Sequence, residues 1–333
     1  FKGMAIKVAI IGLGIMGRRM LEHMNLHAAF QPSAFWDPDP AACSAARQMS
    51  PDTRLASSAD DALGDADLVY LACPPRPRKQ IALTAAGAGK AVFLEKPLGI
   101  DGAESTALVT ALESAGVPAA INFTQAAGAA LGDISRDALD GTLGNLVGAE
   151  IIVTYSAWPR GWQMAADWLR LRDEGGMTRE VISHFLFFIE RILGPLSVVS
   201  AHPTYPADYT LCETHLVAQL ENADGLPVSI MAAVGGAQPD RQELTIKASK
   251  ISRRVAEFSI DMASDGGPFT PLQQQPDDPR AVALQAQLDQ LKLCFEGEPH
   301  CLATPAEGLR VQKLVETMLS SSAPVKKKET SND

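Results

Sequence analysis

The chain contains no long apolar run and no excess of positive charge. None of its apolar stretches approaches the roughly 18 residues that a membrane-spanning helix requires, and its start lacks the apolar segment of a signal peptide. Its 29 lysines and arginines are outnumbered by 39 acidic residues, and the resulting net charge of −10 disfavours a nucleic-acid backbone as partner. We therefore expect a cytoplasmic protein that binds neither membranes nor nucleic acids.

Cysteine and aromatic residues are also scarce. The five cysteines are widely spaced and form no C-x-x-C motif, so reduced thiols are expected rather than a disulfide framework. Cys294, His300 and Cys301 lie close in sequence, but a fourth ligand at suitable spacing is lacking, and no metal is predicted. Aromatics make up 6% of the chain and hydrophobic residues 46%, as in an ordinary globular protein long enough for two domains.

The segment Gly12-Leu13-Gly14-Ile15-Met16-Gly17 is the most informative part of the sequence. It follows an apolar run over residues 6–11 and begins a helical pattern that extends to residue 26. Asp37 stands at the end of a second apolar run, over residues 34–36. A lone glycine triplet is weak evidence, but strand, glycines, helix, strand and terminal acid together form the dinucleotide-binding fingerprint.

Each residue of this fingerprint has a physical task. Gly12 permits a tight turn, Gly14 lets the backbone approach a pyrophosphate, and Gly17 lets helix and strand pack closely. The unpaired N–H groups at the helix start, at Ile15 and Met16, would face the phosphates. Asp37 would accept hydrogen bonds from the ribose hydroxyls and repel a 2′-phosphate, which favours NAD over NADP. The alternative is a ligand-free glycine turn with a surface aspartate, and the joint fit of the spacings argues against it.

Up to residue 122, short apolar runs alternate with helical patterns. Strands are predicted over residues 6–11, 34–36, 68–73, 91–94 and 119–122, and helices over 15–26, 40–48, 77–88 and 102–114. This alternation is typical of βαβ units with right-handed crossovers and a doubly wound parallel sheet, the Rossmann arrangement of an α/β protein. We assign it to a dinucleotide-binding domain over residues 4–123.

Longer strands follow, and they predict a second, α+β domain with an open, mostly antiparallel sheet. Strands are expected over residues 146–155, 196–201, 211–220, 227–234, 244–248 and 255–260, and helices over 131–139, 177–193 and 278–295. Short gaps between the last four strands predict that sequence neighbours pair antiparallel. Alternating polar and apolar residues suggest one covered face, and the other face could join subunits into a homodimer or homotetramer.

The domain assignment follows from this change of pattern. Residues 124–303 are predicted to bind substrate and to mediate oligomerisation. A helix over residues 304–321 is expected to pack back on the first domain. The polar stretch over residues 322–333 is expected to be a disordered tail.

Two segments carry chemistry suited to a small-molecule substrate. Glu95-Lys96-Pro97 directly follows a predicted strand, at the carboxyl edge where ligands bind in open α/β sheets. Lysine there can stabilise negative charge on a substrate oxygen, although a solvated lysine is the commoner outcome. Glu180 and His184 are four apart and share a helix face, so the carboxylate could orient the imidazole and tune its pKa. The alternative is a surface ion pair beside a buried histidine.

A third stretch combines tryptophan with arginine. Aromatic planes stack on sugar or ring faces, and arginine reads hydroxyls or carboxylates, so the stretch could bind substrate. An ordinary loop packed on the following helix explains it equally well. The candidate substrate residues are Trp158, Arg160, Trp162, Trp168 and Arg170.

Taken together, these motifs resemble the Gfo/Idh/MocA oxidoreductases, the family of glucose–fructose oxidoreductase and inositol dehydrogenase. The resemblance covers nearly the whole chain and is most specific in the first domain. The matching segments are the glycine turn, Ala72-Cys73-Pro74-Pro75, residues 89–98 with Glu95-Lys96-Pro97, Asn122-Phe123, Gly175-Gly176 with Glu180 and His184, and Leu193-Gly194-Pro195.

The resemblance implies a nicotinamide-dependent dehydrogenase or reductase acting on CH–OH groups of a sugar-like, cyclic or polyol substrate. It implies that Lys96 binds the reacting oxygen and that His184 moves its proton, with Glu180 one turn earlier. It also adds Cys73, Pro74, Glu95, Lys96 and Asn122 to the cofactor contacts.

The sequence departs from the family pattern at three positions. Glu180 stands where aspartate is usual, Arg78 takes the place of a common histidine, and the arginine that usually follows Asn122-Phe123 is missing. These differences predict an unusual substrate. Two alternatives stay open: an NAD-dependent glycosidase that recycles its hydride, and a non-catalytic nicotinamide-sensing regulator.

Overall fold

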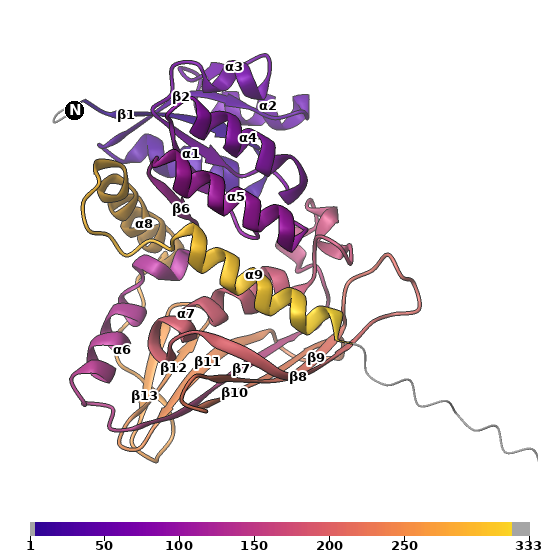
Figure 1. Cartoon of the computed structure of the whole chain (residues 1–333), viewed down its shortest axis with the longest axis vertical. Helices are drawn as coiled ribbons and strands as arrows, with labels where there is room; N and C mark the ends of the chain where they lie inside the picture. Colours follow the sequence, from indigo (N-terminus) through magenta and orange to yellow (C-terminus); the bar gives the residue numbers. More distant parts are fainter. Residues whose placement is uncertain (1–3, 322–333) are drawn as a thin grey trace, which may run out of the picture.

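Residues 4–321 are described by a computed structural model, shown in Figure 1. The predicted tail over residues 322–333 lies outside the described residues. The chain forms two sheets, one of six strands and one of eight, with helices α8 (Pro279–Glu296) and α9 (Pro305–Ser320) between them.

The first sheet is parallel and has the strand order β3-β2-β1-β4-β5-β6. It consists of β1 (Ile6–Ile11), β2 (Phe30–Trp36), β3 (Arg54–Leu55), β4 (Leu68–Leu71), β5 (Ala91–Leu94) and β6 (Ala119–Ile121). The connecting helices are α1 (Ile15–Leu26), α2 (Pro40–Met49), α3 (Ala59–Leu63), α4 (Pro75–Gly87) and α5 (Gly102–Ala115). This is the Rossmann arrangement that the alternating pattern predicted. The prediction succeeded because parallel strands that are buried on both faces consist of continuous apolar runs in the sequence.

The second sheet is mixed and mostly antiparallel, with the order β14-β13-β12-β11-β7-β10-β9-β8. Its longer strands are β7 (Leu146–Tyr155), β8 (Leu196–Thr204), β9 (His215–Asn222), β10 (Pro227–Val234) and β11 (Arg241–Ala248). We expected each strand of this sheet to pair antiparallel with the next strand in the sequence, and this expectation was wrong for β10 and β11. β7 lies between β10 and β11, parallel to β10 and antiparallel to β11, so these two consecutive strands do not touch as a hairpin.

A single strand predicted over residues 255–260 was also wrong. The chain forms a hairpin there, with β12 (Ser252–Ala256) paired antiparallel to β13 (Ile260–Ser264), and β14 (Thr270–Pro271) follows. Glu257 and Phe258 occupy the turn with φ of 50° and 65°. These left-handed conformations at non-glycine residues end the strand where the apolar pattern continues.

Helices cover one face of the large sheet (Figure 1). They include α6 (Ala129–Leu139) and α7 (Ser183–Leu193), and α7 contacts β7 and β11. The helix predicted over residues 177–193 begins differently from expectation, because Thr178–Ile182 form a π-helical turn before α7. Short 3-10 turns at Thr124–Ala127, Gly161–Gln163 and Asp167–Arg170 complete the second half.

Helix α9 joins the two halves of the molecule. It contacts α5 and β6 on one side and α7 and β8 on the other, and Figure 1 shows it running between the sheets. A capping box at Thr304 and Glu307 fixes its start. Within residues 4–321, no helix combines the length and apolarity needed to cross a bilayer.

Candidate active site

The glycine turn between β1 and α1 has the geometry of a phosphate cradle. Gly12 has φ +94°, and a Cβ on Gly17 would lie 1.8 Å from the carbonyl oxygen of Gly12, so both positions require glycine. A Cβ on Gly14 would meet nothing within 4 Å, because this residue faces open space. Gly14 also provides no side-chain cap for α1. The N–H groups of Ile15 and Met16 therefore start a helix whose positive end is open to an anion.

Asp37 lies beside this turn at the end of β2. Its Oδ2 accepts a hydrogen bond from the N–H of Leu13 at 2.7 Å, and its Oδ1 accepts one from Asp39 at 2.8 Å. The carboxylate therefore has a fixed orientation next to the glycine turn. A carboxylate in this position is suited to bind ribose hydroxyls.

Lys96 follows β5 and extends to the second half of the molecule. Its Nζ donates hydrogen bonds to the carboxylate Oε2 of Glu180 at 2.7 Å and to the carbonyl oxygen of the same residue at 2.6 Å. The carbonyl oxygen of Arg179 lies 3.4 Å from the ammonium. The lysine side chain is 7% exposed, so the ammonium is buried in a cluster of oxygen acceptors.

The π-helical turn explains why these carbonyl oxygens are available. The N–H of Ser183 donates to the carbonyl of Thr178, five residues earlier, instead of following the α-helical spacing. π-helical turns leave carbonyl groups without their ordinary helical donors and often occur at functional sites. Here the carbonyl groups of Arg179 and Glu180 accept from Lys96.

Two glycines and a buried glutamate hold the start of this turn. A Cβ on Gly175 would lie 2.2 Å from the carbonyl oxygen of Leu169, and one on Gly176 would lie 2.3 Å from Oε2 of Glu213. Glu213 accepts from the N–H and the hydroxyl of Thr178, at 2.8 and 2.6 Å. The two adjacent glycines are a sequence feature from which close packing could be predicted. No sequence motif around Glu213 indicates its role, because Glu213 lies far from this turn in the sequence.

His184 occupies a buried, aromatic environment. Its ring makes edge contacts with Phe123 and Phe258, with centroids 5.6 and 5.7 Å away. Burial, and then the positive charges of Lys96 and Arg160, hold the pKa of His184 well below its usual value. The imidazole is therefore neutral at pH 7 and can accept a proton.

The expected pairing of Glu180 with His184 was wrong. The Glu180 carboxylate contacts Lys96 and, at 3.2 Å, the amide Nε2 of Gln163, and among residues 4–321 the Nδ1 atom of His184 has no hydrogen-bond partner. The π-helical turn changes the angular relation between positions four residues apart. Aromatic packing, not a carboxylate, fixes the imidazole.

Arg78, the residue at the family's usual histidine position, has a structural task. It is 3% exposed, and its guanidinium donates to the carbonyl oxygens of Glu95 and Cys73 at 2.7 and 2.5 Å and to that of Pro97. Cys73 and Pro74 form the turn after β4. Arg78 therefore ties this turn to the segment that carries Lys96.

Glu95 and Asn122 are predicted cofactor contacts whose side chains point into the protein. The Glu95 carboxylate accepts from the Tyr70 hydroxyl at 2.5 Å and from the amide of Asn122 at 2.6 Å. The Asn122 oxygen in turn accepts from Gln287 on α8 at 3.2 Å. Burial raises the pKa of Glu95, and its hydrogen bonds oppose that rise. This network fixes the carboxyl ends of β5 and β6.

The tryptophan and arginine stretch divides into two groups. Arg160 is 9% exposed, donates to Gln163 at 2.8 Å, and lies 4.7 Å from the centroid of the Trp162 ring. Because Gln163 also contacts Glu180, this arginine belongs to the Lys96 cluster. Trp158 packs beneath it and donates its indole N–H to the carbonyl of Leu169.

Trp168 and Arg170 lie in the following 3-10 turn. Arg170 is exposed and lies 3.8 Å from Asp167. The described contacts do not link either residue to Lys96 or His184, so a substrate role for them stays a prediction.

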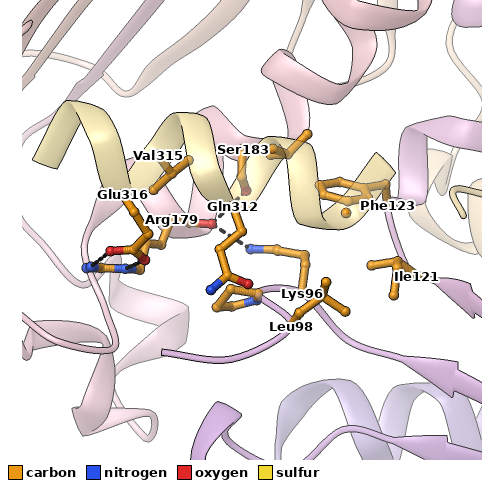
Figure 2. Close-up of a pocket in the computed structure, with 12 residues that line it drawn as sticks. Lys96, Leu98, Ile121, Phe123, Arg179, Ser183, Gln312, Val315 and Glu316 are labelled. Carbon is orange, nitrogen blue, oxygen red and sulfur yellow. Dashed lines mark hydrogen bonds and ion pairs between the residues drawn. The ribbon is translucent and has the colours of Figure 1, made fainter. Parts of the chain in front are cut away.

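A small cavity lies behind Lys96, between its loop, the π-helical turn and α9 (Figure 2). Gln312 of α9 points into it toward Leu98 and Lys96. Neither amide atom of Gln312 has a hydrogen-bond partner among residues 4–321. The cavity volume is about 10 Å³, at the lower limit for one water molecule.

The fold and the glycine turn define a dinucleotide-binding protein, and comparison with known proteins supports this class. Residues 6–123 match the model of the GFO_IDH_MocA oxidoreductase family, described as having an NAD-binding Rossmann fold. This match agrees with the resemblance that the motifs indicated, and residues 6–123 form an NAD-binding Rossmann domain.

Relatives and solved structures extend the likeness over the rest of the chain. A protein described as a UDP-kanosamine synthase oxidoreductase subunit, from Amycolatopsis mediterranei strain S699, is 28% identical over 77% of this chain and 72% of its own. The WlbA dehydrogenase from Bordetella pertussis, in complex with NADH and UDP-GlcNAcA, is 22% identical over 95% of both chains, with a TM-score of 0.78. GenD2 from gentamicin A biosynthesis, in complex with NAD, is 18% identical over 95% of this chain and 93% of its own, with a TM-score of 0.78. The predicted two-part fold is thereby confirmed.

Proposed function

We propose that this protein transfers a hydride between NAD and a secondary alcohol, or its ketone, on a sugar-like substrate. The observation that carries the proposal is the convergence of a buried ammonium, Lys96, and a neutral imidazole, His184, from two separate halves of the chain. Lys96 donates to the carbonyl of Glu180, one turn before His184, and Phe123, whose ring contacts His184, lines the same small cavity as Lys96. These contacts support a single site for the two groups.

The cofactor fits the glycine turn. Gly12 and Gly17 fix the close packing of β1 and α1, Gly14 leaves the approach open, and the N–H groups of Ile15 and Met16 supply donors. Asp37 supplies the acceptor for ribose hydroxyls and repels a 2′-phosphate, which supports a preference for NAD over NADP. The sheet edge next to the glycine turn is formed by two segments, the Cys73-Pro74 turn and the segment from Glu95 to Lys96. Arg78 links these two segments through hydrogen bonds.

The chain's own groups would do the following chemistry. Lys96 donates a hydrogen bond to the reacting oxygen and stabilises negative charge on it. His184 takes the hydroxyl proton during oxidation and returns it during reduction. Glu180 holds the Lys96 ammonium in place. When bound, the nicotinamide supplies the hydride acceptor or donor.

The substrate class rests on the relatives and on the site. The Amycolatopsis and Bordetella proteins named above carry UDP-linked sugars in their descriptions. Arg160 donates to Gln163, which contacts Glu180, so the rings of Trp158 and Trp162 beside Arg160 are placed to contact such a substrate. A panel of sugars, polyols and UDP-sugars, assayed with NAD and NADP at the reduced-nicotinamide absorbance, tests the proposal. A UDP-sugar or sugar alcohol that reduces NAD supports it, and no absorbance change with any member opposes it.

We also propose that the uncovered face of the large sheet joins subunits. Val199, Val217 and Met231 are 56%, 57% and 48% exposed on β8, β9 and β10. The same strands, with β7, line a shallow groove of about 420 Å³. Exposed apolar surface of this kind marks interaction sites. Sedimentation of the protein and of Met231→Glu tests this: a dimer or tetramer that the variant weakens supports it, and a monomer in both contradicts it.

A further inference from the structure

Two guanidinium groups from distant parts of the chain pack against the ring of one exposed tryptophan, Trp162. The Trp162 ring lies 4.7 Å from the Arg160 guanidinium carbon and 5.1 Å from that of Arg280, which belongs to the first turn of α8. Trp162 is 47% exposed. The arrangement therefore faces solvent at the edge of the site.

A third arginine, Arg19, lies on a helix that packs along α8. Gln285 of α8 donates to the carbonyl oxygen of His23, one turn after Arg19 on α1. Arg19 belongs to α1, directly after the glycine turn. Partial desolvation, followed by the positive charges of Arg19 and Arg160, lowers the pKa of Arg280. The positive charges of Arg19 and Arg160 therefore act on Arg280, although the three residues come from α1, the loop after β7, and α8.

None of these arginines forms an ion pair with a carboxylate of residues 4–321. Arg160 donates to the neutral amides of Gln163 and Gln242, Arg19 contacts the sulfur of Met16, and the described contacts of Arg280 are with the Trp162 ring. Like charges that share a small region repel one another. Asp278, the N-cap of α8, opposes part of this repulsion at Arg280, but its carboxylate accepts from the N–H of Ala281 and forms no ion pair with the three arginines. Their convergence with so little counter-charge, in a chain with more acidic than basic residues, indicates an anionic ligand.

We propose that Arg19, Arg160 and Arg280 form a subsite for a phosphoryl group, a phosphate ester or a diphosphate, carried by the substrate. This inference rests on the proposed function, because it places the rest of the substrate between the subsite and His184. Guanidinium groups bind phosphate oxygens in a bidentate manner, and three of them match two or more negative charges better than a single carboxylate does. The exposed face of Trp162 provides a stacking surface for an attached ring.

The position of the subsite separates it from the catalytic pair. Arg160 contacts Gln163, which bonds to Glu180, whereas Arg19 follows the glycine turn on α1 and Arg280 lies in the first turn of α8. Arg280 and Arg19 therefore select the substrate without touching the reacting oxygen.

The test measures binding to enzyme saturated with NAD, so that the cofactor's own phosphates are already bound. Inorganic pyrophosphate, glucose 1-phosphate, UDP-glucose and glucuronate are titrated by calorimetry into wild type, Arg280→Gln, Arg19→Gln and Arg47→Gln. Arg47 is an exposed arginine on α2 and serves as the matched control. We expect pyrophosphate to bind, each of the two subsite variants to weaken it by about 10-fold or more, and Arg47→Gln to leave it unchanged.

Three results would overturn the subsite. They are an absence of pyrophosphate binding, tighter binding of glucuronate than of any phosphorylated probe, and an equal loss of NAD affinity in Arg280→Gln and Arg19→Gln. Glucose 1-phosphate and UDP-glucose distinguish a monoester from a nucleotide-linked substrate, and binding of either supports the proposal. The variant Lys96→Ala distinguishes failure of the subsite proposal from failure of the hydride-transfer proposal. Its affinity for pyrophosphate should stay within about 2-fold of the wild-type value, whether or not hydride transfer is confirmed.

Discussion

The Nζ atom of Lys96 lies 2.7 Å from Oε2 of Glu180 and 2.6 Å from the carbonyl oxygen of that same residue. With the carbonyl of Arg179 at 3.4 Å, all three donors of the ammonium have protein partners. A substrate oxygen must therefore replace one of these acceptors when it binds. The weakest of the three contacts, that to Arg179, is the one we expect to yield.

Removing either proposed catalytic group should lower turnover strongly. Lys96→Ala and His184→Ala are each expected to reduce kcat by roughly 10²- to 10⁴-fold, the usual effect of losing a positioned acid–base group. NAD affinity of His184→Ala, measured by fluorescence titration, should change little, because the glycine turn and the Lys96 segment are untouched. Near-normal turnover in both variants would contradict the assigned roles.

The pH dependence should reflect a neutral His184. Because its native pKa lies well below 6.5, kcat/KM for oxidation should not fall as the pH drops through 6.5 and should decline at a lower pH. A decline centred near pH 6.5 that His184→Asn abolishes would contradict the burial of this group.

Stability should respond to the same group. The unfolded chain binds a proton near pH 6.5 that native His184 does not bind, so the free energy of unfolding should decrease as pH falls below 6.5. The slope contributed by this residue is at most about 1.4 kcal/mol per pH unit. Urea midpoints at pH 7 and pH 5 should differ less in His184→Asn than in wild type, and equal differences would refute the assignment.

Two neighbouring aspartates allow a matched test of cofactor choice. Asp37→Asn removes the charge expected to repel a 2′-phosphate, so the ratio of kcat/KM for NAD over NADP should fall by about 10-fold, the value of roughly 1.4 kcal/mol. Asp39 caps α2 through the N–H of Ala41. Asp39→Asn should leave the ratio within about 2-fold of wild type, since asparagine caps nearly as well as aspartate. Equal ratios in all three proteins would remove Asp37 from cofactor selection.

Gly14 and Gly17 should respond oppositely to alanine. A methyl group at Gly17 would overlap the Gly12 carbonyl, and the backbone shift should destabilise the protein by about 3 kcal/mol. A methyl group at Gly14 meets open space, so Gly14→Ala should keep its melting temperature but bind NAD at least about 10-fold more weakly, because the methyl occupies the phosphate approach. Unchanged NAD binding by a folded Gly14→Ala protein would argue against the cradle.

Gln312 offers a stability test outside the chemistry. An apolar side chain of similar length removes a buried amide that lacks protein partners, so Gln312→Met should raise stability by about 1 kcal/mol. Thermal unfolding should show an increase of roughly 2 °C. A decrease would mean that an ordered water molecule in the adjoining cavity pairs with the amide.

Local patterns predicted the first half of the molecule well, and the second half less well. The glycine turn, α1 and Asp37 follow from residues close in sequence, because backbone geometry at Gly12 and Gly17 is a local requirement. The insertion of β7 between β10 and β11 depends on packing across the whole sheet, which strand periodicity does not contain. The hairpin at Glu257 was missed because neither turn residue is a glycine.

In the candidate site too, features set by nearby residues were predicted from the sequence, and features set by long-range contacts were not. Lys96 and His184 were recognisable from motifs, but the partner of Glu180 depends on a π-helical turn that has the sequence signature of an ordinary helix. Arg19 and Arg280 carry no motif and meet only in the folded chain. Long-range electrostatic relationships of this kind are absent from sequence spacing.

The Arg78 clamp has a mechanical consequence. Because it binds carbonyl groups just after β4 and just after β5, Arg78 links the Cys73 turn to the loop that carries Lys96. A shift of one of these two segments therefore strains the hydrogen bonds to the other, and we expect the turn and the loop to move together. A histidine, with two ring nitrogens, could not donate to all three carbonyls, so the arginine at this position makes a link that a histidine could not make.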